Sequence, residues 1–169
     1  MPEAKTDYLA ILRTLVEHQV DFIVVGGVCG VLHGAPLITL DLDVVHSRAP
    51  ENLPRLLTAL QALDAYYREQ PARKIRPGLS HLASPGHSLL KTSAGPLDVL
   101  GTVGHDLAYE NLQEHTVEEK VAEGLKVRIL DLPTLIRIKE EAGRSKDKAA
   151  LLILRRTLEE KAKAKGDSP

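Results

Sequence analysis

Hydrophobic residues recur along the first part of the chain at two spacings, and each spacing predicts a different element. After Thr6 they recur every three or four residues, which predicts a helix with one buried face and Thr6 as its cap. The runs DFIVV (21–25) and LDLDVV (40–45) are typical of short strands, and VCGVLHG (28–34) between them of a short helix. Leucines at helical spacing predict another helix after Pro50. This order indicates an α/β fold.

The middle of the chain predicts hairpins. Residues 68–87 contain three prolines and no clear periodicity, so we expect an irregular segment there. The segments 88–103 and 115–130 each look like two strands joined by a turn that contains glycine. Hairpins combined with the earlier strands predict a mixed β-sheet flanked by helices, the α+β variant of this class.

The last third of the chain predicts two helices. Asp131 is typical of a helix cap, and this helix should end near Gly143. Leucines at helical spacing predict a final helix from about Ser145. Charged residues dominate at the end, so residues 159–169 are expected to form a solvated or disordered tail. The length of 169 residues suits one domain, which we expect over residues 1–158.

Composition narrows the functional classes. Lys and Arg number 22 and Asp and Glu 23, a net charge of −1, which predicts no general attraction to nucleic acid or to a membrane. One phenylalanine and four tyrosines leave few platforms for stacking single-stranded bases. The single cysteine suits a reducing compartment, and charged residues interrupt the N-terminal apolar residues as they would not in a signal peptide. A cytoplasmic location is therefore expected.

Two aspartates stand within the second strand-like run. Asp41 and Asp43 are two residues apart, so on a strand both side chains point to the same face. Leu40, Leu42 and Val44 would then point to the other face, into the core. Two carboxylates this close repel each other unless a divalent cation keeps both ionised. Magnesium suits such a pair, because it prefers oxygen ligands and shares them with substrate phosphates.

A third aspartate and a glycine pair complete the pattern. Asp98 lies alone among apolar neighbours in GPLDVL. Gly26 and Gly27 follow the first strand-like run, where glycines let backbone N–H groups approach a phosphate closely. Taken singly, each feature has an ordinary alternative, namely solvated acids on an edge strand or a tight turn. Their combination favours a site for a metal ion and a phosphate.

With these residues in this order, the sequence resembles the DNA polymerase beta-like nucleotidyltransferase superfamily, in particular the small bacterial AbiEii-toxin-like and minimal nucleotidyltransferases. Their signature is Gly-Gly or Gly-Ser after a hydrophobic residue, then Asp-x-Asp or Asp-x-Glu after roughly nine to thirteen residues, and later a lone Asp. Here the glycine pair 26–27, a gap of thirteen residues, the pair in 41–43 and Asp98 correspond to it. The likeness spans about residues 8–155 and includes LPTLIRIKEEAGRSKD at 132–147.

The resemblance implies a reaction and a set of roles. A nucleoside monophosphate would pass from an NTP to an acceptor hydroxyl with release of pyrophosphate, in the presence of Mg²⁺ or Mn²⁺. Asp41, Asp43 and Asp98 would be the catalytic metal ligands, and Asp98 would also help to deprotonate the acceptor. The implied partners are the NTP, an unidentified acceptor (tRNA, protein or small molecule) and the partner protein of a toxin–antitoxin pair, with no membrane. The nucleotide-binding candidates near the acids are Gly26, Gly27 and Thr39.

A cationic cluster near the predicted helix break supplies further candidates. Lys139, Arg144 and Lys146 surround Gly143 and could contact the outer phosphates of the NTP. The alternative is an ordinary solvated helix junction. Relatives often carry an arginine two residues before the position of Thr39, where this chain has leucine, so another cation would have to replace it.

The remaining polar residues allow further interpretations. Cys29 and His33 are four residues apart on the short predicted helix and could act as nucleophile and base, although a buried cysteine is more often a small hydrophobic residue. His46 follows the aspartate strand directly and is a further candidate. Two alternative functional classes are a nucleotide-binding or antitoxin-like protein without turnover and an interaction domain whose acids are merely solvated.

Overall fold

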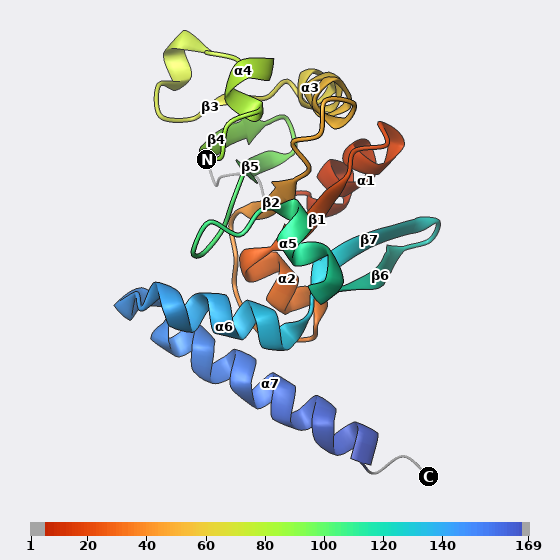
Figure 1. Cartoon of the computed structure of the whole chain (residues 1–169), viewed down its shortest axis with the longest axis vertical. Coiled ribbons are helices and arrows are strands. Elements are labelled where there is room, and N and C mark those ends of the chain that lie inside the picture. The colour runs from red at the N-terminus through yellow and green to blue at the C-terminus, as the bar shows by residue number, and fades with distance from the viewer. Residues whose placement is uncertain (1–5, 167–169) are drawn as a thin grey trace, which may run out of the picture.

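A mixed sheet runs through the protein (Figure 1), whose computed structural model describes residues 6–166. The sheet has seven strands in the order β3-β4-β5-β2-β1-β7-β6. Two neighbouring pairs, β1 with β7 and β2 with β5, are parallel, and the other pairs are antiparallel. The α/β fold and the mixed sheet are therefore confirmed. The strands are β1 (Phe22–Val25), β2 (Leu42–His46), β3 (Tyr66–Tyr67), β4 (His87–Thr92), β5 (Gly95–Leu100), β6 (Thr116–Ala122) and β7 (Leu125–Leu130).

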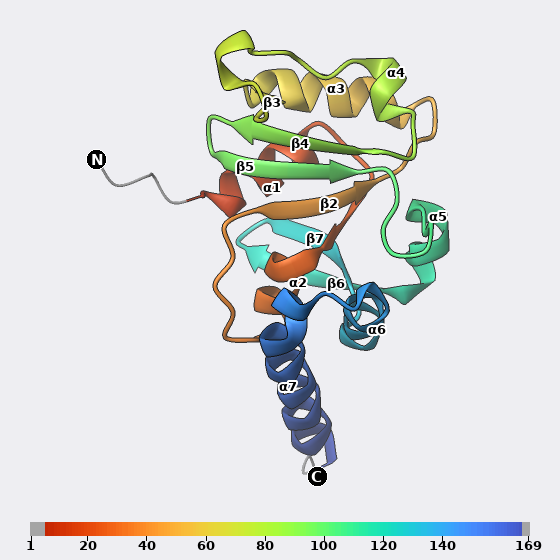
Figure 2. The ribbon, with the colours of Figure 1, turned by 90° about the vertical axis from the view of Figure 1, so that its left-hand side faces the viewer.

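Helices cover both faces of this sheet. The α-helices are α1 (Tyr8–Glu17), α2 (Gly26–Leu32), α3 (Asn52–Ala62), α4 (Leu79–Leu82), α5 (Tyr109–Leu112), α6 (Leu132–Ala142) and α7 (Lys148–Gly166). Figure 2 shows α1 behind the strands and α2 in front of them, with α6 and α7 below α2 in this view. The apolar stripe that predicted α1 faces the core only in part, because Leu12 and Leu15 are buried, with Ile11 beside them, whereas Leu9 is 44% exposed.

The start of α1 differs from the prediction. The cap is Asp7, whose carboxylate accepts a hydrogen bond from the Ala10 N–H at 3.0 Å. Thr6 instead donates its hydroxyl to the Leu40 carbonyl at 2.7 Å. The prediction that Thr6 caps the helix was therefore wrong, because Thr6 ties the N-terminal segment to the loop before β2.

The strand that carries the aspartates begins later than predicted. Its ladder with β5 starts at Leu42, opposite Leu97, and Leu40 lies outside the ladder. Leu42 and Val44 are fully buried, as expected, whereas the Leu40 side chain is 75% exposed. The placement of Leu40 in the core was therefore wrong, because no strand within residues 6–166 pairs with the chain at that point.

The predicted hairpins are confirmed, and residues 68–87 are largely irregular, as predicted. The strand pairs β4–β5 and β6–β7 are antiparallel neighbours joined by short turns, the second of them at residues 123–124. Between β3 and β4 the chain forms a single 3₁₀ turn, Pro71–Arg73, and the short helix α4, and residues 69–76 are exposed. The segment therefore lies along the outer edge of the sheet beside β3.

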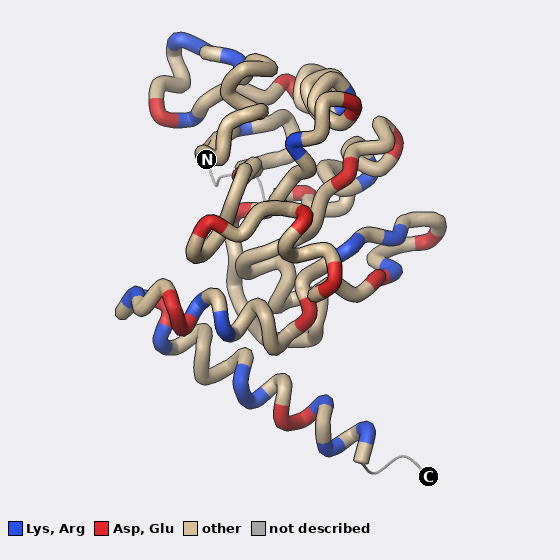
Figure 3. Tube along the Cα trace, in the orientation of Figure 1, with Lys and Arg blue, Asp and Glu red and all other residues tan. Residues whose placement is uncertain are grey.

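The two C-terminal helices begin as predicted, but the second continues further. Asp131 accepts the Thr134 N–H at 2.8 Å, and α6 ends at Gly143 with φ +61°. Helix α7 continues to Gly166 through exposed residues, in which Glu159 and Glu160 are followed by three lysines (Figure 3). Residues 159–166 are thus solvated, as expected, but they are helical rather than disordered, because Glu, Lys and Ala are strong helix formers. Residues 167–169 lie outside the described residues.

Candidate active site

The parallel strands β2 and β5 bring the predicted aspartates together. Asp43 is the register partner of Asp98, and on its other side Asp43 pairs with Val25, the last residue of β1. Side chains in one row across a sheet point to the same face, and Asp41, just before β2, lies on this side too, because it shares the guanidinium of Arg68 with Asp98. The three carboxylates therefore gather on one face of the sheet, beside the start of α2.

Asp43 lies in an environment that disfavours its charge. Burial is the main cause, together with the nearby Asp98 and Asp41, and these effects raise the pKa of Asp43 to about 7. Lys139 acts in the opposite direction, though less strongly. Among the residues of the described chain, 6–166, Asp43 Oδ1 finds no hydrogen-bond partner although it is buried. The cluster therefore offers an oxygen to a cation or a donor that residues 6–166 do not supply.

Arg68 provides one cation to this cluster, and the sequence analysis did not find it. Its guanidinium Nη1 lies 2.6 Å from Asp98 Oδ1, and its Nη2 lies 3.6 Å from Asp41 Oδ2. Arg68 follows β3, at the start of the segment expected to be irregular. The only sequence signal was general, namely that carboxylates in an apolar strand require a positive partner.

The glycine pair makes room for two side chains of the site. Gly26 has φ +70°, and a Cβ on it would lie 2.2 Å from Asp43 Oδ2. A Cβ on Gly27 would lie 2.9 Å from Thr39 Oγ1. Thr39 Oγ1 in turn donates to the Asp41 carbonyl at 3.1 Å, and Tyr8 donates its hydroxyl to the Thr39 carbonyl. Glycine at these positions therefore lets the aspartate strand and its leading loop approach the beginning of α2.

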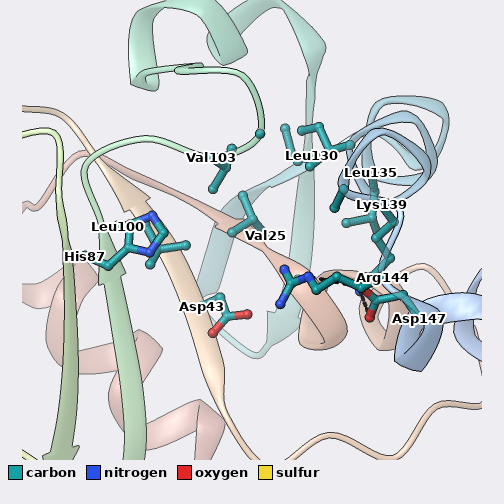
Figure 4. Close-up of a pocket in the computed structure, with 14 residues that line it drawn as sticks. Val25, Asp43, His87, Leu100, Val103, Leu130, Leu135, Lys139, Arg144 and Asp147 are labelled. Carbon is teal, nitrogen blue, oxygen red and sulfur yellow. Dashed lines mark hydrogen bonds and ion pairs between the residues drawn. The ribbon is translucent and has the colours of Figure 1, made fainter.

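A cavity of about 180 Å³ lies against Asp43 and extends to the junction of α6 and α7 (Figure 4). Its polar lining residues include Asp43, His87, Lys139, Arg144 and Asp147. Figure 4 shows the Arg144 side chain extending from the junction toward Asp43. One end of the cavity is thus acidic and the other basic.

Asp147 organises the basic end of the cavity. Its carboxylate lies 3.4 Å from Lys139 Nζ and 3.5 Å from Arg144 Nε. Asp147 is the last residue of the stretch 132–147 that resembles the family, but the sequence predicted no role for it. Lys146, in contrast, is exposed and does not line the cavity. The structure therefore brings Lys139 and Arg144 to the site and leaves Lys146 outside it.

The donor set fits a divalent cation in its chemistry. Asp41, Asp43 and Asp98 offer only carboxylate oxygens, the ligands that Mg²⁺ prefers, and the buried Asp43 Oδ1 is unpartnered within the described residues. In the arrangement of residues 6–166, however, no group of three or more His, Cys, Asp or Glu side chains is gathered closely enough to hold a metal ion. Asp98 and Asp41 are instead directed to Arg68.

The other candidates from the sequence are structural. Cys29 Sγ and His33 Nε2 both donate to the Leu130 carbonyl, at 3.4 and 2.7 Å, rather than to each other. Burial raises the pKa of the Cys29 thiol to about 12, which leaves it protonated and unreactive. His33 Nδ1 also accepts a hydrogen bond from Lys161 Nζ at 3.0 Å, which connects α2 to α7.

His46 lies on the other side of the sheet from the aspartates. It is 2% exposed, its Nε2 lies 2.7 Å from the Leu82 carbonyl, and burial lowers its pKa. Because it is three residues after Asp43, its side chain points to the opposite face. His46 therefore belongs to the packing between β2 and α4.

Comparison with known proteins supports the fold. No family model matches the sequence, and no curated protein matches it. Among solved structures, the chain is similar to a crystal structure from Thermotoga maritima described as a "putative nucleotidyltransferase", with a TM-score of 0.56 and 16% identity. The match covers 91% of this chain and 94% of the other. This likeness shows that the chain has the fold of that protein over nearly its whole length.

None of the helices in residues 6–166 combines the length and the hydropathy that a membrane crossing requires.

Proposed function

We propose that the protein is a metal-dependent nucleotidyltransferase that moves a nucleoside monophosphate from an NTP to an acceptor hydroxyl and releases pyrophosphate. The observation that carries this proposal is the pairing of Asp43 with Asp98 on neighbouring parallel strands, with Asp41 beside them and an adjoining cavity whose far end is basic. The fold shared with the Thermotoga maritima structure and the order of the glycine and aspartate motifs support the same function.

The acidic end of the site would hold the metal ions. Asp41, Asp43 and Asp98 would bind Mg²⁺ or Mn²⁺, which when bound would neutralise charge at the α-phosphate. Asp98, on the strand next to Asp43, would also accept the proton of the acceptor hydroxyl. Metal binding would favour the charged form of Asp43 and so overcome the effects that raise its pKa.

The basic end of the site would hold the nucleotide. Lys139 and Arg144 line the cavity that leads away from Asp43, and they would contact the outer phosphates. Asp147 would keep both cations in place through the contacts at 3.4 and 3.5 Å. Gly26 and Gly27 would let the triphosphate approach the backbone, and Thr39 would lie beside it.

The test is incorporation of label from α-phosphate-labelled NTPs in the presence of Mg²⁺ and a cell extract as the source of acceptors. Wild-type protein should label one fraction and release pyrophosphate, and Asp43→Asn should not. The matched control is Asp64→Asn, because Asp64 is an exposed acid paired with Arg76 away from the site. Absence of both label transfer and Mg-NTP binding by the wild type would refute the proposal.

The proposal also covers the acceptor, the biological role and the cellular location. The acceptor would be a tRNA end, a protein side chain or a small-molecule hydroxyl, and the labelled fraction distinguishes them. An AbiEii-like role as one component of a toxin–antitoxin pair, and a cytoplasmic location, follow from the sequence resemblance and composition.

The second candidate function is a nucleotide-binding protein without turnover. It is favoured by Arg68, which already neutralises Asp98 and Asp41, and the label-transfer assay separates it from the first.

A further inference from the structure

Arg68 belongs to one row of residues that crosses the sheet. Its backbone N–H donates to the Leu89 carbonyl at 3.2 Å, Leu89 is the register partner of Asp98, and Asp98 is that of Asp43. The row therefore has an arginine at its outer end and two acids at its inner end. Because side chains in such a row share a face, the Arg68 side chain extends across β4 to reach Asp98.

The guanidinium of Arg68 is bound by three oxygens. Nη1 lies 2.6 Å from Asp98 Oδ1 and also donates to the Leu90 carbonyl at 3.1 Å, while Nη2 lies 3.6 Å from Asp41 Oδ2. The Arg68 side chain is 29% exposed and that of Asp98 only 14%. A charge-assisted bond of this length in a half-buried position is stronger than an ordinary surface ion pair.

The same carboxylates are the ligands proposed for the divalent cation. We propose that Arg68 is an internal cation that occupies Asp98 and Asp41 in the absence of metal and that a divalent ion must displace. This inference rests on the proposed function, because it takes the three aspartates as the metal ligands. A positive side chain and a metal ion that share ligands oppose each other's binding, and this opposition is reciprocal.

The position of Arg68 allows such displacement. It directly follows β3, which has only two residues and forms the edge of the sheet. Residues 69–76, which come after it, are exposed, so moving them disturbs few buried contacts. Release of the guanidinium would leave Asp98 and Asp41 free to bind a metal ion together with Asp43 Oδ1, which has no partner in the described part of the chain.

The experiment is direct titration of Mn²⁺, followed by the EPR signal of the free ion, without nucleotide. Arg68→Gln should bind Mn²⁺ about tenfold more tightly than wild type, because the competing charge is gone. Arg76→Gln is the matched control, since Arg76 also makes an ion pair at 2.6 Å, with Asp64, and is in the same segment. Its affinity should equal that of the wild type. Asp43→Asn in the wild-type background should lose the binding.

A thermal melt gives a second readout that does not depend on activity. In EDTA, Arg68→Gln should melt at a lower temperature than Arg76→Gln, because Asp98 and Asp41 then lose their cationic partner, and Mn²⁺ should raise its melting temperature more than that of the wild type. If Arg68→Gln does not fold, Arg68→Lys takes its place. A lysine has one nitrogen in place of the two guanidinium nitrogens that contact Asp98 and Asp41, so this variant should hold the acids less firmly and also bind Mn²⁺ more tightly than wild type.

The outcomes separate the two proposals. Mn²⁺ affinity that is unchanged or weaker in both Arg68 variants, but lost in Asp43→Asn, would overturn the role of Arg68 and leave the metal-dependent function standing. Absence of Mn²⁺ binding by every variant, with or without NTP, would overturn both.

Discussion

Asp43 and Asp98 face each other across two parallel strands, yet they have different partners. Asp98 is bound to Arg68 at 2.6 Å, whereas Asp43 Oδ1 is buried without a partner among residues 6–166. Neutralising Asp98 therefore removes an ion pair, whereas neutralising Asp43 removes a buried charge. This asymmetry gives the most direct structural test of the site.

Replacing each acid by asparagine should change stability in opposite directions at pH 8 in EDTA. Asp43→Asn should be as stable as wild type or more stable, because it removes a buried charge near two other acids. Asp98→Asn should lower the free energy of unfolding by about 1–3 kcal/mol, because it leaves the half-buried Arg68 without its main partner. Urea unfolding measures both changes. Equal losses in the two variants would contradict the asymmetry.

Stability without metal should decrease as pH rises from the acid range toward neutrality. The pKa of Asp43 is raised to about 7 in the folded protein, above its value in the unfolded chain, so the folded state binds more protons between the two values. The contribution of Asp43 is therefore fully present below the unfolded pKa and is lost as pH approaches and passes about 7. Unfolding in EDTA at several pH values from about 4 to about 8, which brackets the window between the unfolded pKa value of 3.8 and about 7, checks it. In Asp43→Asn this component of the pH dependence should disappear.

Gly26→Ala should destabilise the protein more than Gly124→Ala. Both glycines have φ +70°, so both substitutions carry the same strain of about 1–2 kcal/mol in the left-handed region. At Gly26 the new Cβ would also lie 2.2 Å from Asp43 Oδ2, whereas at Gly124 nothing lies within 4 Å. Denaturant unfolding of the two variants isolates the contact with Asp43. The difference should shrink when Asp43→Ala is added to Gly26→Ala, and a constant difference would argue against the contact.

Lys139→Ala should weaken NTP binding, and Lys146→Ala should leave it unchanged. Lys139 lines the cavity and is held by Asp147, whereas Lys146 is exposed outside it. The sequence alone treated both lysines as phosphate ligands, and the structure distinguishes them. Calorimetric titration with Mg-NTP and with the matching NMP measures the effect. A loss of affinity of about tenfold for the NTP and little for the NMP is expected. Similar losses from both lysine variants would show that the phosphates lie elsewhere.

The sequence predicted the acids of the site better than their partners. Asp41, Asp43 and Asp98 were found because a charged residue in an apolar run is conspicuous, and alternation along a strand fixes its face. Arg68 is thirty positions from Asp98, and their contact depends on the order of β3, β4 and β5 in the sheet. Local patterns do not contain strand order, so this partner could not be predicted.

The errors at element ends have a similar origin. Thr6 and Asp7 are both good capping residues, and only the tertiary bond from Thr6 to the Leu40 carbonyl decided between them. The strand with the aspartates was extended by hydrophobicity to Leu40, although its ladder with β5 begins only at Leu42. Elements with strong periodicity, such as α1, were in contrast located well.

The hydrogen bond from Lys161 to His33 affects how the chain can be shortened. A truncation after residue 158, where the sequence suggested that the domain ends, would remove Lys161 and with it the bond at 3.0 Å that holds the far part of α7 to α2. Helix α2 begins at Gly26, next to Asp43, so the C-terminal helix also holds in place the helix that packs beside the acidic cluster. Expression for binding or activity measurements therefore requires the whole helix, through Gly166.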